Sequence, residues 1–468
     1  MADPGNAYTH GSIPLTFART ALPIILLTSV NGLLTVVDAI FLGAFVGPEA
    51  LTAVTMVFPV SMLMIALAAM ISTGMASVLA RLLGANRAGE ARAILAGAHG
   101  LSLIVSVVAM ALFAALGWPL AVQAAQGATE LAAMGHSFLR IAVYSSPLLF
   151  LLSVHSDALR TEGRVGFMSI AGLLVTLANI GVNYLLIVVF ELGAAGSAWG
   201  TALAQAIALV VIMLYRASGK ARLTLAPRDA VDWRAGWGEM LALGAPRSLS
   251  FIGIAAGAAA TIASLRLFGG AHTDASIAAY GVISRMMTFV FFPLLGMSLA
   301  LQAMVGNNVG AGLWPRSNAT LKLALIWSFA YAGSAEIGLI LMRKQLGGLF
   351  VADPIVTAEV ARILPTFVAG YFSFGPMMMI SNYFQSIGDV GRSALLSLAR
   401  TYLFAIPLIF VLPLGLGEDG IWLALPIADA ALVAVTLAVL KSRSRQAAWG
   451  LFQMAGVGLP RGRLFAQD

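Results

Sequence analysis

The stretch NGLLTVVDAIFLGAFVGPEA, from Asn31 to Ala50, decides how this chain folds. It is almost entirely apolar, yet it carries the carboxylate of Asp38, far from any basic residue in sequence. An ionised side chain at mid-membrane costs at least about 2.5–3.5 kcal/mol on insertion scales, and such residues usually face an interior cavity and carry function. The stretch therefore predicts a membrane span with a functional acid.

The composition of the whole chain also predicts a membrane protein. Of its 468 residues, 60% are hydrophobic and 10% are charged, whereas soluble domains are about 45–50% apolar and about 25% charged. The chain has no cysteine, which excludes disulfides and thiolate metal sites. It also has no phosphate-binding G-x-x-x-x-G-K-[ST] run, which excludes an ATP-driven pump within this chain. We expect no enzyme activity.

Twelve apolar runs are long enough to span a membrane as helices, which requires about 20 residues each. They exceed the ~10-residue alternating strands of a membrane barrel. We therefore expect an all-α polytopic membrane protein. The rough centres of the runs are near residues 30, 63, 105, 145, 177, 205, 255, 288, 329, 373, 403 and 431.

Lys and Arg residues gather in every second loop and in the C-terminal tail. Loops rich in Lys and Arg usually face the cytoplasm, so both termini are predicted to be cytoplasmic. The net charge of +7 then reflects membrane topology and does not indicate a nucleic-acid partner. The basic clusters lie at 81–92, 160–164, 216–234, 316–322, 392 and 441–463.

The two halves of the chain match at a nearly constant offset. Pro23 aligns with Pro246, Gly84 with Gly310, and Gly163 with Gly388. Six spans bring the chain back to the same side, so the halves are predicted to be parallel repeats with a substrate site between them near the midplane. We expect a first six-helix lobe at 1–215, a cytoplasmic linker at 216–238, a second six-helix lobe at 239–442 and a cytoplasmic tail at 443–468.

Several motifs occur in order along roughly 14–440. The first half contains VDAIFLGAFVGPEALTAV, ARLLGANRAGEA and LRTEGRVGFMSI, and the second contains AAYGVISRMMTFVFF and YFQSIGDVGRSALLSLAR. This set resembles the multidrug and toxic compound extrusion (MATE) transporters. The resemblance implies two lobes around a V-shaped cavity and cation-driven export by rocker-switch alternating access. It is closer to the DinF-like and related branches than to the NorM-like branch, because the seventh and tenth spans carry no carboxylate.

Polar residues spaced three and four apart form stripes on three helices of the first lobe, and one stripe carries Asp38. A buried carboxylate can exchange a proton, and carboxylate, amide and hydroxyl oxygens also suit sodium. The compared branches often have a second acid where this chain has Asn183, so a proton is favoured over sodium. Interhelical hydrogen bonding alone is the alternative for the amides and hydroxyls. The predicted ion-coupling residues are Asn31, Thr35, Asp38, Asn179, Asn183 and Thr201, with Asp38, Asn179 and Asn183 as a possible sodium site.

A second group is predicted to line the substrate cavity. Flexible thioethers suit a promiscuous apolar site, although methionines more often simply pack. Arg285 lies deep in the eighth span, where it either faces the cavity or pairs with Asp429. Glu336 and Arg400 are interpreted as snorkelling residues, and the histidines as structural. The predicted cavity residues are Met62, Gln205, Arg285, Met286 and Met377.

The hypothesis from the sequence is an inner-membrane antiporter that exports amphipathic, often cationic, drugs or metabolites. We expect a monomer in contact with lipid, with no cofactor beyond the coupling proton or sodium. A lipid-linked precursor flippase of the same superfamily is an alternative, but it would be expected to need extra spans and more intramembrane cations than Arg285. A second alternative is a non-transporting receptor or scaffold, but such a protein would explain neither the repeat nor the buried acid.

Overall fold

The computed structural model describes residues 6–223, 232–270, 273–351 and 353–444. Within these ranges the regular structure is helical, with short π-helical turns η1 (Leu42–Val46), η2 (Tyr184–Val189) and η3 (Ala399–Ala405). The first half contains α1 (Ile13–Phe41), α2 (Pro48–Gly84), α3 (Ala88–Ala124), α4 (Thr129–Tyr144), α5 (Ser146–Thr161), α6 (Val165–Asn183) and α7 (Gly193–Ala217).

The second half repeats this pattern with more breaks. It contains α8 (Trp237–Phe268), α9 (Thr273–Gly310), α10 (Trp314–Leu341), α11 (Arg343–Phe350), α12 (Pro354–Val368), α13 (Tyr371–Ser386), α14 (Val390–Leu398), α15 (Ile406–Val411), α16 (Pro413–Leu416) and α17 (Glu418–Ser444). Much of the predicted linker, at 224–231, and most of the predicted tail, at 445–468, lie outside the described residues.

The helices account for the predicted spans. Ten helical segments of the described chain are long and apolar enough to cross a membrane, and two bent pairs raise the number to twelve. The bent pairs are α4 with α5 and α12 with α13, each with an angle of 47°. Every predicted centre falls inside one of these segments or pairs. The all-α, twelve-span prediction is therefore confirmed.

The break between α12 and α13 has a specific cap. Gly370 adopts a left-handed φ of +89° there. The Glu336 carboxylate of α10 accepts hydrogen bonds from the backbone N–H groups of Gly370, at 3.1 Å, and Phe372, at 2.8 Å. A carboxylate at a helix N-terminus satisfies free N–H groups and complements the helix dipole. The snorkelling interpretation of Glu336 is therefore wrong.

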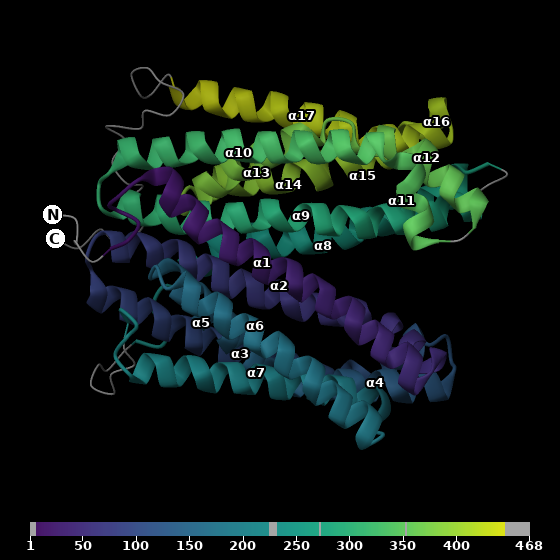
Figure 1. The fold of residues 1–468 in the computed structure, drawn as a ribbon, viewed down its shortest axis with the longest axis horizontal. Helices are drawn as coiled ribbons and strands as arrows, with labels where there is room; N and C mark the ends of the chain where they lie inside the picture. The colour runs from purple at the N-terminus through teal and green to yellow at the C-terminus, as the bar shows by residue number, and fades with distance from the viewer. Residues whose placement is uncertain (1–5, 224–231, 271–272, 352, 445–468) are drawn as a thin grey trace.

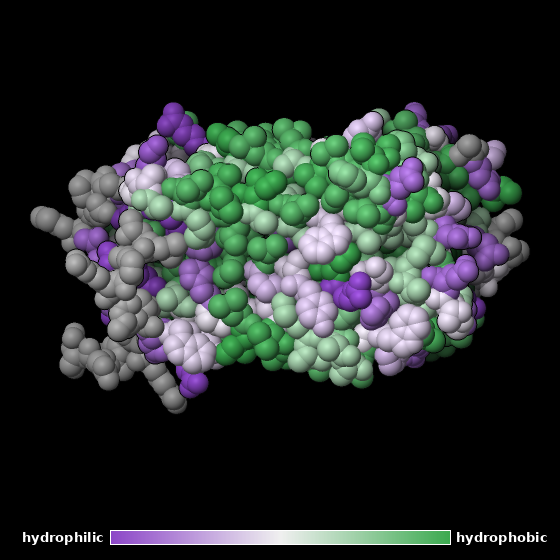
Figure 2. Space-filling view, turned by 90° about the horizontal axis from the view of Figure 1, so that it is seen from below, coloured by the Kyte–Doolittle hydropathy of each residue, from purple (hydrophilic) through white to green (hydrophobic). Residues whose placement is uncertain are grey.

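The helices form two lobes, α1–α7 and α8–α17 (Figure 1). The lobes approach each other at the left of that view and diverge toward the right, where α4 and α12 lie. In the turned view, hydrophilic side chains gather toward both ends of the molecule, with apolar side chains over most of the face between them (Figure 2). Large apolar residues such as Leu177 and Leu214 are about two-thirds exposed, as expected of a surface that meets lipid.

Glycines that the repeat aligns bring the lobes into backbone contact at the closed end. A Cβ atom on Gly84 of α2 would lie 2.0 Å from the carbonyl oxygen of Asn307 on α9. A Cβ on Gly310 of α9 would lie 1.9 Å from the carbonyl oxygen of Arg81 on α2. Only glycine permits this approach. Because both halves supply one, the repeat builds a symmetric contact between the lobes.

Candidate functional site

A chain of hydrogen bonds links the predicted polar stripes of α1, α6 and α7. The Asn183 amide nitrogen donates to Asp38 Oδ1 at 2.7 Å and to Asn179 Oδ1 at 3.1 Å. Asn179 in turn donates to Thr201 Oγ1 at 3.3 Å. The structure therefore brings these four predicted residues together. Asn179 and Asn183 lie one turn apart on α6, and they contact Thr201 of α7 and Asp38 of α1.

The other predicted ion-coupling residues lie along the same helix pair. Thr176 of α6 donates a 2.9 Å hydrogen bond to Asn31 Oδ1 of α1, about two helix turns from Asp38. The Thr35 side chain lies outside the described part of the structure. Asn31 thus takes part in the contact between α1 and α6, away from the carboxylate.

Asp38 has no basic partner among the described residues, where its hydrogen bond comes from the neutral amide of Asn183. The Oδ1 atom of Asn183 is buried and also accepts no hydrogen bond there. Gly200 of α7 makes room for it, since a Cβ at that position would lie 1.7 Å from this oxygen. The half-buried carboxylate of Asp38 and the free, buried amide oxygen of Asn183 form an acceptor-rich site, which a proton or a hard cation would satisfy.

Two helices of this site change geometry directly after it. α1 passes into η1 at Leu42, one turn beyond Asp38, and α6 passes into η2 at Tyr184, the residue after Asn183. Single π-helical turns inside α-helices are frequent at functional sites. Sequence analysis did not predict them, because the apolar pattern of both spans continues through the turns.

The predicted arginine–aspartate pair is different in the structure. Arg400 Nε lies 2.5 Å from Asp429 Oδ1, and Arg400 Nη2 lies 3.1 Å from Oδ2. Arg285 is exposed on α9 and has no ion pair among the described residues. The alternative in which Arg285 pairs with Asp429 is therefore wrong. The snorkelling interpretation of Arg400 is also wrong, because its side chain forms an ion pair with Asp429 inside the second lobe.

The second lobe contains a pocket of about 130 Å³. Met377 lines it, whereas Met62, Gln205, Arg285 and Met286 do not, and a substrate cavity formed by these five residues stays a prediction. Met286 is instead buried in the apolar core between α9, α12 and α17. Sequence analysis missed the polar part of this pocket. Its lining residues are Pro246, Arg247, Ser250, Ile254, Phe291, Phe374, Met377, Met378, Ser381, Asn382, Gln385, Leu396, Ser397, Arg400, Thr401 and Leu432.

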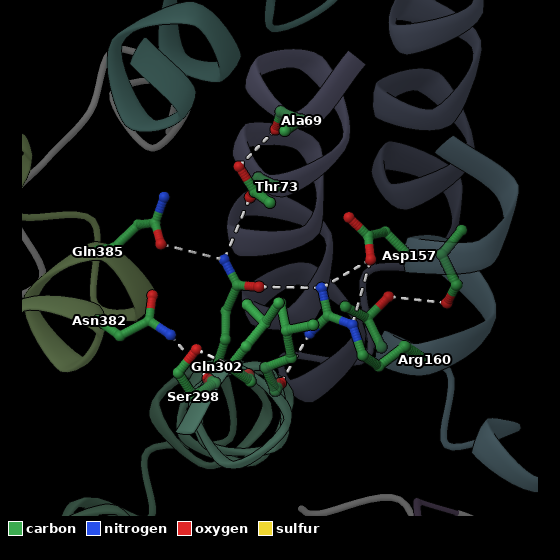
Figure 3. Close-up of polar contacts among 12 residues, drawn as sticks. Ala69, Thr73, Asp157, Arg160, Ser298, Gln302, Asn382 and Gln385 are labelled. Atoms are coloured by element: carbon green, nitrogen blue, oxygen red, sulfur yellow. Dashed lines mark hydrogen bonds and ion pairs between the residues drawn. The ribbon is translucent and has the colours of Figure 1, made fainter. Parts of the chain in front are cut away.

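A buried network joins the lobes at their closed end, and Figure 3 shows its centre. Arg160 of α5 is held by Asp157 through two hydrogen bonds, at 3.2 and 3.0 Å, and donates to Gln302 Oε1 of α9 at 3.0 Å. The Gln302 amide nitrogen donates to the Thr73 carbonyl of α2 at 3.2 Å and to Gln385 Oε1 of α13 at 3.4 Å. We call these five residues the seam network.

Further polar contacts extend this closure. Arg81 of α2 forms a 2.7 Å ion pair with Glu239 of α8, where the Arg81 side chain is 4% exposed. Asn6, ahead of α1, donates to Asn307 of α9 at 2.8 Å. Sequence analysis counted Arg81 and Arg160 only as topology signals. Their position inside the quoted loop motifs was the signal that could have marked them as buried.

Two of the three intramembrane histidines meet. His99 Nε2 of α3 and His155 Nε2 of α5 are 2.9 Å apart, while His136 stacks on Phe113. The described residues contain no group of three or more His, Asp or Glu side chains arranged to hold a metal ion. The pair therefore joins α3 to α5 inside the first lobe, which agrees with a structural role.

The MatE family model matches this chain twice, over residues 23–185 and 250–411. The chain belongs to the MatE family. The two matched regions correspond to the two lobes and confirm the internal repeat. The prediction of a MATE-type transporter, and not an enzyme, is confirmed with them. The branch preference stays a prediction.

Three similar proteins align with this chain over most of their length. The FAD transporter of Shewanella oneidensis is 25% identical over 90% of this chain and 93% of its own. The probable multidrug resistance protein YoeA of Bacillus subtilis is 23% identical over 87% of this chain and 89% of its own. The multidrug export protein MepA of Staphylococcus aureus is 22% identical over 93% of both chains.

Solved structures share the fold of this MatE-family chain. An outward-facing multidrug resistance MATE family transporter superposes with a TM-score of 0.87 at 22% identity, over 96% of this chain and 100% of that one. A transporter from Pyrococcus furiosus superposes with a TM-score of 0.85 at 24% identity, over 95% of this chain and 98% of that one. It is described as having a binding pocket of reverse polarity.

Proposed function

We propose that this MatE-family protein is a cation-coupled antiporter that exports amphipathic compounds by rocker-switch alternating access, with Asp38 as the coupling acid. The observation that carries the proposal is the hydrogen bond from the Asn183 amide to an Asp38 carboxylate with no basic partner among the described residues. An acid in a membrane-spanning helix that lacks a basic partner needs another source of compensation. Uptake of a cation would supply it.

A proton is favoured over sodium for this role. The cluster contains one carboxylate, and one of its neighbouring amide oxygens, that of Asn179, is already occupied by the Asn183 amide. Sodium would need Asp38, Asn179 and Asn183 to turn several oxygens inward at once, whereas a proton needs the carboxylate alone. The number of free oxygens in the cluster therefore supports proton coupling.

Contacts of α1 with the other lobe give the coupling acid a route to the conformational change. A Cβ on Gly32 of α1 would lie 2.2 Å from the Phe292 ring of α9, and one on Gly296 would lie 2.5 Å from Ile25. Protonation of Asp38 would weaken its bond from Asn183 and so loosen α1 from α6. Because α1 also packs against α9, such a shift would bear directly on the second lobe.

The seam network defines the state of the transporter. The network closes the lobes through the hydrogen bond from Arg160 to Gln302, and the Arg81–Glu239 ion pair lies at the same end. This is the end where Lys and Arg residues cluster in the loops. With the positive-inside orientation, this end is cytoplasmic and the structure faces outward. Export then requires the network to open and expose the space between the lobes to the cytoplasm.

The substrate range follows from chemistry and from the relatives. The second-lobe pocket has both apolar and polar walls, which suits amphipathic molecules, and the similar proteins include multidrug exporters and an FAD transporter. We propose a bacterial-type inner membrane as the location, with both termini cytoplasmic, and a monomer as the working unit. The flippase alternative would need more cations facing the membrane interior than the described structure provides.

The test is transport in proteoliposomes. Ethidium movement is followed under an imposed proton gradient or sodium gradient for wild type, Asp38→Asn and the control Glu49→Gln, which removes an exposed acid just beyond the same span. We expect the proton gradient to drive transport, Asp38→Asn to abolish it and Glu49→Gln to retain it. Transport that persists unchanged in Asp38→Asn would contradict the proposal.

A further inference from the structure

We propose that the second-lobe pocket binds the anionic group of an amphipathic substrate, with Arg247 as its receptor. This inference rests on the proposed export function and names a substrate class for it. It differs from the cationic class expected from the sequence.

Arg247 is the cation of this pocket that lacks a partner. It lies on α8 directly after Pro246, and within the described residues its guanidinium forms no hydrogen bond and no ion pair. Its recorded ring contact is with Phe251, 5.3 Å from the guanidinium carbon to the ring centre. A guanidinium offers five N–H donors and stays charged, so a site inside a lobe that leaves them unused is built to receive acceptors.

The neighbouring acids do not neutralise Arg247. No Asp or Glu is among the residues that line the pocket. Asp157, whose charge acts on Arg247, already accepts two hydrogen bonds from Arg160. Asp429 is bound by the other pocket arginine, Arg400, through two contacts. The pocket therefore carries a net positive charge, which repels a cation and attracts a carboxylate or phosphate.

The remaining walls suit the rest of an amphipathic molecule. Phe291, Phe374, Met377 and Met378 line the pocket together with residues that carry hydroxyl and amide groups. Aromatic faces and thioethers pack against rings without strict shape demands. The volume of about 130 Å³ is close to that of cavities that hold a benzene ring. The pocket thus accommodates the charged end and one ring, and leaves the remainder of a larger substrate outside.

The pocket also adjoins the closed end of the transporter. Asn382 and Gln385 line it, and both bind the seam region from α13. Gln385 accepts the hydrogen bond from Gln302, and Asn382 donates to the Ser298 carbonyl at 2.7 Å (Figure 3). Both of these hydrogen bonds stay within the second lobe, but the Gln385 carbonyl also accepts a 2.6 Å hydrogen bond from Ser77 of the first lobe. An anion at Arg247 would therefore lie close to a contact that must break when the lobes change their orientation.

The test compares flavin mononucleotide with riboflavin, which share a ring system and differ by one phosphate. Binding to the purified full-length protein is measured by flavin fluorescence without any gradient. We expect wild type to bind the phosphorylated flavin about tenfold more tightly, as a charge-assisted contact allows. Arg247→Gln should remove this preference and Arg247→Lys should keep part of it. The control Arg266→Gln, which removes an exposed cation from the last turn of the same helix, should match wild type.

A second variant guards against misfolding of Arg247→Gln. Ser250→Glu places a carboxylate one turn along α8 in the same pocket, and it should also remove the preference. Equal binding of the two flavins by wild type, or a preference that survives in both Arg247→Gln and Ser250→Glu, would overturn the inference. Since binding needs no gradient, a phosphate preference that depends on Arg247 stands even if coupled transport fails. Conversely, transport that depends on Asp38 stands if the preference is absent.

Discussion

Arg160 of the first lobe donates a 3.0 Å hydrogen bond to Gln302 of the second, and its side chain is 1% exposed. The same guanidinium donates to the Leu299 carbonyl at 2.7 Å and is held by Asp157 within its own lobe. A buried cation that divides its hydrogen bonds between two lobes ties them together only while they are closed. Under the proposed alternating access, the seam network would have to form and break as the lobes close and open.

Substitution Gln302→Ala should open the seam more often. The change removes the acceptor of a charge-assisted hydrogen bond, worth about 1.5–3 kcal/mol, so the population of the opened state should rise about tenfold. The chain has no cysteine, so Ser77→Cys, buried in the seam, provides a single labelling site. Maleimide should label it faster in the Gln302→Ala background. Gln345→Ala, exposed on α11, is the control, and equal labelling rates in all backgrounds would contradict the prediction.

Substitution Gly84→Leu should prevent closure without unfolding either lobe. Its Cβ would meet the Asn307 backbone 2.0 Å away, and backbone cannot move aside as a side chain can. We expect transport to be lost and the Ser77→Cys site to be labelled readily. Gly89→Ala is the matched control, because a Cβ there meets nothing within 4 Å. Normal transport by Gly84→Leu would show that the lobes do not need this contact.

Substitutions at Asn183 should tune the coupling site. Asn183→Leu removes the amide that donates to Asp38, and transport driven by a proton gradient should fall at least about tenfold, as for loss of a hydrogen bond to a charged group. Asn183→Asp adds a second carboxylate, and a response to a sodium gradient should appear, since sodium favours more charged oxygens. The measurement is dye transport in proteoliposomes under each gradient. Transport by Asn183→Leu at the wild-type rate would remove Asn183 from the mechanism.

Substitution Arg216→Met should make stability depend on pH. Arg216 forms a 2.9 Å ion pair with Glu162, and both side chains are 0% exposed. Burial raises the pKa of Glu162, and the Arg216 charge opposes that rise. Without Arg216 the pKa of Glu162 rises further. The folded state then binds a proton more readily than the unfolded state, so stability is full at low pH and is lost as pH rises through the raised pKa.

The measurement is thermal unfolding of Arg216→Met in detergent at pH 5 and pH 8. Loss of one partner of a buried pair costs about 3–5 kcal/mol, and we expect most of this loss to appear at pH 8. The double variant Glu162→Gln/Arg216→Met removes the titrating group and should show a much smaller difference between the two pH values. A loss in Arg216→Met that is equal at both values would mean that Glu162 stays ionised.

Sequence patterns predicted the fold because lipid imposes simple rules. Backbone N–H and C=O groups in hydrocarbon must form hydrogen bonds within their own helix, so each long apolar run predicts a membrane-spanning helix. The offset between Gly84 and Gly310 likewise predicted the repeat, since aligned glycines mark equivalent places in two copies. Asp38, Asn179, Asn183 and Thr201 could be grouped in advance, because residues three and four apart share a helix face.

Side-chain partners between distant helices were not predictable in the same way. Asp429 pairs with Arg400 and not with Arg285, although all three lie in apolar runs. The neighbours of Arg247 in sequence form an apolar run. Only the packing of α8 against α14, η3 and α17 makes Arg247 the unpartnered cation of a pocket. Such choices depend on the rotation of each helix about its axis, which periodicity within one helix does not specify.

Composition and spacing by themselves determined that this protein is a twelve-span membrane protein with a repeated lobe and an acid in its first span. These properties are local, because they follow from the hydropathy of each segment and the period of one helix. Tertiary structure decided the hydrogen bond from Asn183 to Asp38, the seam that Arg160 and Gln302 close, and the positive pocket around Arg247. These three features arise where helices far apart in sequence meet. Close packing of side chains selects one arrangement of the helices from many that the sequence pattern allows.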